Sequence, residues 1–576
     1  MSFFEKKKTS KVTLDDTVFL SCIVEGAQKQ DDHIEYTLKV QRGPMVEQSW
    51  TVQKRYSDFT ALDSELRVSN VELPLPPKRV FGNFDREFIA ERKQGLQAYI
   101  DAIVQNFLLS NSLYFKRFLD QDHYSVNFTE LALQHVSMVF RSEKGWDVVE
   151  TLHDIGWRFR KSYIMVKHNS QPKIKQVLTW CDYGPDKFIP DKEMVAILNL
   201  FSTIQHPHIY HTEFATGSET GGLVIRNYCD KGTLRDYLCK CKPKNNYLKK
   251  YANPKITQNL DIGAIKMFGK QILETLKFLT EKGLPYCHLH CSNIILEDGC
   301  CKILDIENWL LGIPSYYRSF YTQFKKINSC ESIDVYCFGH VIYEMCFGKP
   351  LNQATCDSYP PDCPAEIRSV LESILTTEAC KNGLPSLSDL LLHPLFSDVA
   401  FSYINKPVLK IPSKLKEAIK TAKEDMERRL KEEQKIIHKV KRISKAKEFH
   451  MSEGEKKKRI KSKKKALESG DKEQPPKTPT SPTSPSAENG PAQSPMTPTA
   501  PLSAPAAPPA PPPPGPPPVA APPPPAVAPP PPAAAVPPPP PPASSSGRGA
   551  LLSSITGFSK GGLKKVATVD KSKPKL

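Results

Sequence analysis

Proline is distributed very unevenly along this chain, and this limits where folded domains can lie. Of the 54 prolines in the 576 residues, 33 fall between Pro475 and Pro542. Proline fixes φ and has no backbone N–H, so this stretch cannot form a helix or a central strand. We expect residues 471–546 to be a disordered region of polyproline II character, with the large folded domains before it.

Positive charge is also concentrated in one stretch. Residues 401–470 hold 23 Lys and Arg against 10 Asp and Glu, which is +13 of the formal net charge of +17. Apolar residues at helical spacing predict a charged helix over residues 414–448, although its heptad pattern fails at Glu433. The basic run 456–465 fits a solvated disordered segment, a contact with anionic membrane, or a nuclear signal or nucleic-acid contact. No interleaved aromatic residues or zinc spacing accompany it, so we do not expect nucleic acid as a partner.

The sequence lacks the usual marks of export and of membrane insertion. It begins MSFFEKKKTSK, without the apolar stretch of a signal peptide, and it has no run of about 18 uncharged apolar residues. Its 15 cysteines show no zinc-type spacing and are expected to be reduced. These features predict a soluble cytoplasmic protein that can associate peripherally with membranes.

Residues 12–125 have the pattern of a small α+β domain. Three β-rich runs separated by polar turns precede Phe59 and predict a meander. After Phe59, apolar residues recur at helical spacing in two stretches, which the proline loop 73–77 separates. Arginine and lysine residues follow the third run and the proline loop, and guanidinium groups suit phosphate geometry.

Three motifs of this domain resemble, in their order, a phox-homology (PX) domain: RYSDF (55–59), LPLPPK (73–78) and ERKQGLQAYI (91–100). The resemblance implies binding of phosphoinositides, chiefly phosphatidylinositol 3-phosphate. It assigns the four contacts with the lipid as follows: the 3-phosphate to Arg55, the inositol ring to Tyr56, the 1-phosphate to Lys78 and the ring hydroxyls to Arg92. The apolar residues after the proline loop are either core residues or side chains that enter the bilayer: Val80, Phe81 and Phe84.

Residues 143–400 combine strand-like runs with long amphipathic helices. Five strings resemble, in order, the eukaryotic protein kinase fold: LVIRNYCDKGTLRDYL (223–238), CHLHCSNIIL (287–296), KILDIE (302–307), DVYCFGHVIYEM (334–345) and LPSLSDLLLHPLF (384–396). The resemblance implies a bilobal α+β domain. The expected fold class is therefore multidomain: a PX domain, a kinase-like domain, a charged helical segment 401–470 and a proline-rich tail.

The charged positions on which kinase chemistry depends are partly replaced. The resemblance places Trp180 at the position of the phosphate-binding lysine and His288 at that of the catalytic aspartate. The segment that should cover the phosphates has only two glycines, eleven residues apart, where backbone N–H groups need a glycine-rich loop. The two metal-ligand positions are retained as Asn293 and Asp305.

Since phosphoryl transfer depends on positioned charges, these replacements predict a pseudokinase that serves as a binding scaffold and requires no cofactor. Two alternatives stay open. One is a weakly active Ser/Thr kinase recruited to endosomes, in which neutral His288 accepts the proton. The other is a regulator that binds ATP and Mg²⁺ through Asn293 and Asp305 without transfer; the same two residues also suit buried hydrogen-bonding roles.

Residues 547–576 carry a short amphipathic helical pattern followed by L-K-K-V. This order, after a proline-rich tract, resembles the WASP-homology motif and implies binding of an actin monomer. The residues that carry the resemblance are Leu551, Leu552, Ile555, Leu563, Lys564, Lys565 and Val566.

Together these segments predict an adaptor that links endosomal or plasma membrane to actin and regulates the traffic or activity of a membrane-protein cargo. The proline-rich tract adds SH3, EVH1 or profilin-like proteins as expected partners.

Overall fold

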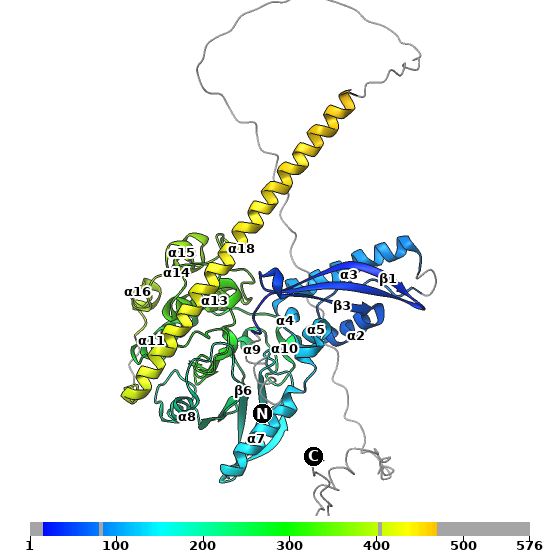
Figure 1. Ribbon diagram of the computed structural model, residues 1–576. Helices are drawn as coiled ribbons and strands as arrows, with labels where there is room; N and C mark the ends of the chain where they lie inside the picture. The colour runs from blue at the N-terminus through cyan, green and yellow to red at the C-terminus, as the bar shows by residue number, and fades with distance from the viewer. Residues whose placement is uncertain (1–14, 80–83, 401–405, 469–576) are drawn as a thin grey trace, which may run out of the picture. The chain divides into compact units, whose positions relative to one another are not determined.

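The computed structural model describes residues 15–79, 84–400 and 406–468 (Figure 1). The proline-rich region 471–546 and the predicted actin-binding residues from Leu551 to Val566 lie outside these ranges, as do Val80 and Phe81.

The first domain is built on a three-stranded antiparallel meander in the order β1-β2-β3, as the sequence predicts. The strands are β1 (Leu20–Gln30), β2 (His33–Arg42) and β3 (Ser49–Arg55). Alternate residues of β2 point to the core, where Tyr36, Leu38 and Val40 are at most 1% exposed.

Helices cover one face of this meander. They are α2 (Tyr56–Leu66), α3 (Arg86–Gln105), α4 (Phe107–Ser110), α5 (Leu113–Leu119) and α6 (Gln121–Tyr124). Phe59, Leu96 and Tyr99 from α2 and α3 are fully buried with the strand residues, and Figure 1 shows α3 lying along the sheet. The predicted α+β class of this domain is therefore confirmed.

Helix α7 (Phe128–Ser142) connects the first domain with the second. Its buried residues Ala132 and Val136 pack in one cluster with Ile164, Leu178 and Leu223 of the second domain. The segment between the predicted domains 12–125 and 143–400 is therefore an added layer on the second domain.

The second domain begins with a five-stranded antiparallel sheet in the order β4-β5-β6-β8-β7. Its strands are β4 (Trp146–Thr151), β5 (Lys161–His168), β6 (Gln171–Asp182), β7 (Phe214–Gly217) and β8 (Gly221–Asn227), with α8 (Asp191–Asn199) beside β7. This sheet with one principal helix is the small lobe of the predicted bilobal fold.

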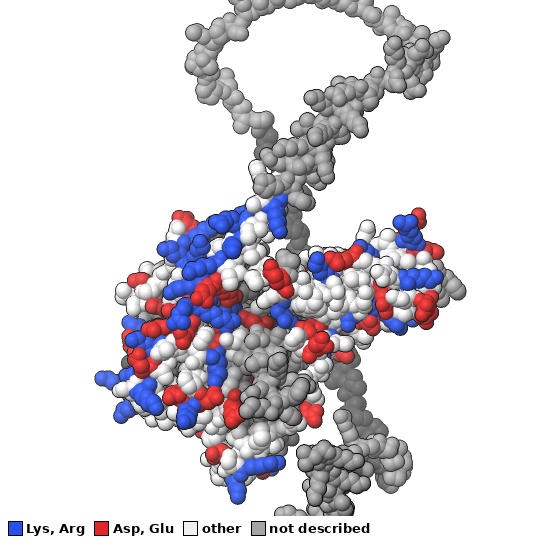
Figure 2. Space-filling model, viewed as in Figure 1, with Lys and Arg blue, Asp and Glu red and all other residues white. Residues whose placement is uncertain are grey.

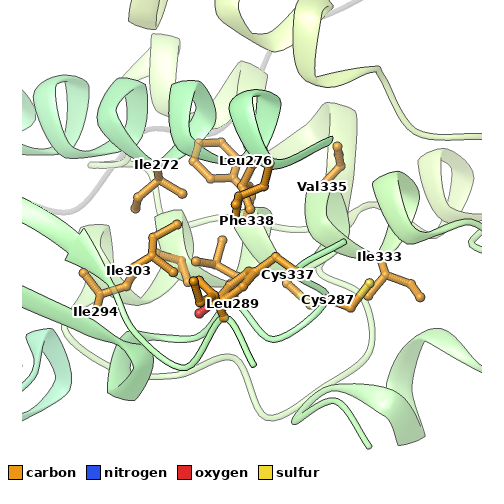
Figure 3. Packing of buried hydrophobic residues seen from close by; sticks show 14 of the residues in the cluster. Ile272, Leu276, Cys287, Leu289, Ile294, Ile303, Ile333, Val335, Cys337 and Phe338 are labelled. Atoms are coloured by element: carbon orange, nitrogen blue, oxygen red, sulfur yellow. The ribbon is translucent and has the colours of Figure 1, made fainter. Parts of the chain in front are cut away.

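The large lobe is mainly helical. Its elements are α9 (Leu234–Leu238), α10 (Tyr247–Tyr251), α11 (Ile262–Glu281), β9 (Ile294–Glu297), β10 (Cys300–Ile303), α12 (Arg318–Tyr321), α13 (Cys330–Phe347), α14 (Ala365–Leu375), α15 (Thr377–Asn382), α16 (Leu387–Leu392) and α17 (Pro394–Ser397). Figure 3 shows Ile272 and Leu276 of α11 meeting Phe338 of α13, above Leu289 and Ile303. Helix α13 is apolar on nearly all sides because it is the buried centre of this lobe.

A long helix, α18 (Ser413–Glu468), follows the large lobe and confirms the helix predicted over residues 414–448. Its apolar residues at helical spacing join the core of the kinase-like domain: Leu415, Ile419, Ala422, Met426 and Leu430. The heptad pattern therefore ends where the helix stops packing on this core, which explains why it does not continue past Glu433.

Candidate functional site

The cationic site of the first domain is centred on the junction between β3 and α2. Arg55 ends β3, and its backbone N–H donates to the Asp58 carboxylate at 2.8 Å, which stabilises the start of α2. Its side chain is 54% exposed, and its guanidinium lies 3.8 Å from the Glu35 carboxylate, so the side chain is open to a ligand. Tyr56 follows, and its hydroxyl donates to the Pro76 carbonyl at 2.5 Å.

Arg92 of α3 completes the centre of this site. Its guanidinium stacks over the Tyr56 ring at 4.3 Å and donates to the Pro77 carbonyl at 3.3 Å. The residue is 7% exposed, and its buried Nε has no hydrogen-bond partner among the described residues. A buried cationic donor without an acceptor is costly in the free protein, and a hydroxyl or phosphate oxygen of a ligand would satisfy it.

The proline loop reaches this site because α3 carries glycine where the loop crosses it. A Cβ on Gly95 would lie 2.5 Å from Cγ of Pro76. Lys78, at the far end of the loop, is exposed. Phe84 is 46% exposed and has the Lys29 ammonium 4.6 Å above its ring, which places it on the surface and not in the core.

The second site is the cleft between the lobes of the kinase-like domain. Lys161, the first residue of β5, reaches across the cleft and donates to Asp305 Oδ2 at 2.6 Å and to Asn308 Oδ1 at 3.0 Å. The side chain of Lys161 is 1% exposed. A lysine therefore faces the predicted metal-ligand position, but it comes from β5, the strand before the one on which the sequence places Trp180.

Arg226 brings a second cation into the same cleft from the end of β8. It donates to both Glu307 oxygens, at 3.2 and 2.6 Å, and lies 3.5 Å from Asp305 Oδ1. Burial alone would raise the pKa of Asp305, but Lys161 and then Arg226 outweigh it, so that this pKa lies below its ordinary value. Each Asp305 oxygen thus faces a protein cation, and the four side chains form a buried group without net charge.

The structure places Trp180 away from the cleft. Neighbouring strand residues point to opposite faces, and it is Thr179 and Val177 that line the cleft. Trp180 is 2% exposed on the other face of the sheet, where it stacks on His135 of α7 at 4.6 Å. The cleft residue at the end of β6 is therefore a threonine, which carries no charge for a phosphate.

His288 and Asn293 belong to the loop before β9. His288 is 1% exposed and does not line the cleft. Its pKa lies well below the ordinary value, first because the ring is buried and then because Arg158 and Lys161 carry positive charge nearby. Asn293 lines the cleft, but its amide donates to the His288 carbonyl at 3.0 Å. Asp334 of α13 holds this loop, because its carboxylate accepts a hydrogen bond from the Cys287 N–H at 2.7 Å. Burial raises the pKa of Asp334 to about 7.

The loop between β4 and β5, which corresponds to the phosphate-covering loop, is tied to neighbouring elements. The Tyr247 N–H donates to the Asp154 carbonyl at 2.8 Å, and the Tyr114 hydroxyl of the first domain donates to the Asp154 carboxylate at 3.1 Å. Phe107 of α4 lies 5.4 Å from Trp157 and 4.7 Å from Tyr316 between ring centroids. The first domain thus contacts Trp157, which lines the cleft, and Tyr316 of the large lobe.

Three members of the buried charge group were not among the predicted site residues: Lys161 and Arg226, which line the cleft, and Glu307, which does not. Lys161 is two residues before Tyr163 on β5, and both line the cleft. Because alternate residues of a strand point to the same face, this spacing was the signal in the sequence that could have placed Lys161 in the cleft. Within the described residues there is no cluster of three His, Cys, Asp or Glu that could hold a metal, and no helix long and apolar enough to cross a membrane.

Comparisons with known families agree with this architecture. The PX domain model matches residues 44–122, the protein tyrosine and serine/threonine kinase model matches residues 171–307, and the WH2 motif model matches residues 544–573. The molecule is thus a PX-domain protein with a protein kinase fold and a WH2 motif, and the predicted resemblances to all three are confirmed.

The relatives narrow this class to one family. The PX domain-containing protein kinase-like proteins of Rattus norvegicus and Mus musculus are each 53% identical to this chain over 446 residues, which is 77% of this chain and 77% of each relative. The chain belongs to the family of PX domain-containing protein kinase-like proteins. It is also 29% identical over 286 residues to the probable inactive serine/threonine-protein kinase slob1 of Dictyostelium discoideum, covering 44% of this chain and 48% of that protein.

Proposed function

We propose that this protein is a phosphoinositide-docked pseudokinase scaffold. The observation that carries the proposal is the contrast between the two sites. In the cleft, the cations from β5 and β8 pair with Asp305 and Glu307, which leaves neither carboxylate free for Mg²⁺. In the PX domain, Arg55 is open, and Arg92 retains a buried donor without an acceptor among the described residues.

The PX site supports docking on membranes that carry phosphatidylinositol 3-phosphate, chiefly endosomes. Sorting nexin-16 of Homo sapiens is a relative at 30% identity over 147 residues, covering 25% of this chain and 39% of that protein. The WH2 match supports recruitment of actin by residues 544–573. A relative from Drosophila melanogaster is named Slowpoke-binding protein; it is 26% identical over 282 residues, which cover 46% of this chain and 54% of that protein. For the present chain we propose a membrane-protein cargo.

The kinase-like body serves this function by binding proteins and needs no cofactor. Its loop before β9 offers no carboxylate at the position of His288, which is buried beside the cleft rather than in it. The SH3, EVH1 and profilin-like ligands of the proline-rich tract stay predictions.

Co-sedimentation of the full chain with vesicles tests the docking. Phosphatidylcholine vesicles with phosphatidylinositol 3-phosphate should bind the wild type, and Arg55→Ala should reduce binding at least tenfold, since a charged hydrogen bond contributes about 1.5–3 kcal/mol. Arg67→Ala is the matched control, because Arg67 is 79% exposed and, in the described structure, its side chain pairs only with Asp63 of α2, at 3.1 Å. Equal binding of wild type and Arg55→Ala would refute the site.

The alternative function is a weak kinase, which the lysine facing Asp305 in the cleft favours. Radiolabelled phosphate transfer by the full chain separates the two functions. The scaffold predicts the same background for wild type and Asp305→Asn, whereas transfer that this substitution abolishes would establish the kinase.

A further inference from the structure

Helix α18 changes character at Gln434. Up to that residue its apolar side chains are buried in the core of the kinase-like domain. Gln434 itself is 2% exposed, and its amide donates to the carbonyls of Phe324 and Ile327 at 2.9 and 2.8 Å. From Lys435 to Lys447 no residue is buried, although the helix continues without a break. We call residues 435–447 the distal segment.

The distal segment is strongly cationic. It contains six basic residues and no acidic one: Lys435, Lys439, Lys441, Arg442, Lys445 and Lys447. All six are exposed, and Figure 2 shows Lys and Arg gathered along this helix. Lys441 donates to the side-chain oxygen of Gln323 at 3.0 Å, and among the described side chains none of the six forms an ion pair. Their charge is therefore available to a partner.

The same segment carries an apolar stripe. Ile436, Val440 and Ile443 follow one another at i, i+4 and i+7 and so share one face of the helix. Ile436 is 44% exposed and Ile443 is 43% exposed. A helix held at one end on a folded body therefore presents exposed branched apolar side chains flanked by lysine and arginine.

We propose that the distal segment binds the surface of anionic phospholipid bilayers as an interfacial helix. Cations alone would suit any polyanion, but an exposed apolar stripe among them gains free energy only where it can enter an apolar layer. The lysine stems lie along that layer while their ammonium groups reach the headgroups. The inference adds a second membrane contact to the proposed function, and one headgroup site by itself is a weak anchor.

Full-chain co-sedimentation with phosphatidylcholine vesicles that contain phosphatidylserine and no phosphoinositide tests the proposal. The charge-reversal variant combines Lys439→Glu, Arg442→Glu and Lys445→Glu. Each cation near an anionic surface raises the affinity about fivefold, so the loss of three cations should weaken vesicle binding at least about a hundredfold. Its folding is checked by the thermal transition, which should not move because the three residues are exposed.

The matched control makes the same change in net charge on the first part of α18, with Lys416→Glu, Lys420→Glu and Lys431→Glu. These lysines are also exposed but are interleaved with Glu and Asp, so the control should bind within about threefold of the wild type. Equal binding of the charge-reversal variant and the control would overturn the proposal.

A second variant, Ile436→Ser with Ile443→Ser, separates a bilayer from other polyanions. It keeps the charge and should weaken vesicle binding about tenfold, since apolar burial is lost. If it binds as the wild type does, an acidic protein or nucleic acid is the partner and the proposal is wrong. Arg55→Ala should retain phosphatidylserine binding and lose only the increment due to phosphatidylinositol 3-phosphate, so failure of the PX site is recognised separately.

Discussion

Breaking the Arg226–Glu307 pair should destabilise the kinase-like domain strongly, because the pair is buried and closes the charge group in the cleft. The two side chains are 4% and 1% exposed and share two hydrogen bonds. Glu307→Leu leaves Arg226 facing only Asp305 at 3.5 Å, and that carboxylate already accepts from Lys161. Removing one partner of a buried ion pair costs about 3–5 kcal/mol.

This cost can be measured as a shift in melting temperature. For a domain of this size, each kcal/mol corresponds to roughly 2–4 °C, so Glu307→Leu should melt about 6–20 °C lower. The double variant Arg226→Met with Glu307→Leu should recover most of the loss, since replacing both charges by apolar groups is close to neutral. Burial alone would lower the pKa of Arg226, but in the wild type Glu307 and then Asp305 outweigh it, so that this pKa lies above its ordinary value. Because a guanidinium keeps its proton in proteins, Arg226 cannot avoid the cost by losing its charge when Glu307 is removed.

The pair Lys244–Glu150 is the control. It has the same charge types at 2.7 Å, but its side chains are 48% and 51% exposed, so Glu150→Gln should lower stability by less than about 1 kcal/mol. Differential scanning calorimetry of the full-length variants decides the matter. A shift of less than about 2 °C for Glu307→Leu would correspond to a loss of stability below about 1 kcal/mol and would show that the cleft charges are not structural. The same conclusion would follow if the double variant were the least stable of all.

Three further outcomes follow from the structure. Gly95→Ala should weaken binding to phosphatidylinositol 3-phosphate vesicles, because the added Cβ displaces Pro76 although no charge is removed. Gly26→Ala is the control and should bind as the wild type does, because a Cβ at Gly26 meets nothing within 4 Å. Equal binding of the two variants would contradict the packing of Pro76 on Gly95. Phe107→Ala should speed hydrogen exchange in the loop between β4 and β5, since its ring packs on that loop; unchanged exchange measured by mass spectrometry would argue against the contact. Asp334→Asn should gain melting temperature relative to the wild type as pH rises from about 5 to 8. Burial raises the pKa of the Asp334 carboxyl to about 7 in the folded protein. Its contribution to stability is therefore present below the pKa of the unfolded state and is lost as the pH rises through the pKa of the folded state. A difference in melting temperature between Asp334→Asn and the wild type that does not change with pH would contradict this prediction.

The fold could be predicted from local patterns because its elements have clear periods. The meander before Phe59 and the apolar stripe from Leu415 to Leu430 both formed as predicted. The cleft was harder, because a one-residue shift along a strand exchanges the two faces of the sheet. Counting along the sequence placed Trp180 in the cleft, while pleating of β6 puts Thr179 there.

Contacts between distant residues could not be predicted at all. Lys161 and Asp305 are 144 residues apart, and Arg226 and Glu307 are 81 apart. No period or spacing in the sequence relates them, because each pair forms only when the small lobe closes on the large lobe. The same holds for Phe107, whose contacts with Trp157 and Tyr316 depend on how the PX domain packs on the cleft mouth.

The charge balance of the cleft bears directly on the scaffold role that we propose for the kinase-like domain. Two cations and two carboxylates satisfy one another there, so the cleft needs no nucleotide or metal to compensate buried charge. A carboxylate pair without such cations would be repelled and would depend on a bound ion. Because the compensation comes from β5 and β8, the small lobe is held to Asp305 and Glu307 by the protein's own side chains. For the scaffold that we propose, this pairing predicts that the lobes stay closed without a ligand and that the outer surface of the domain keeps one shape at any nucleotide concentration.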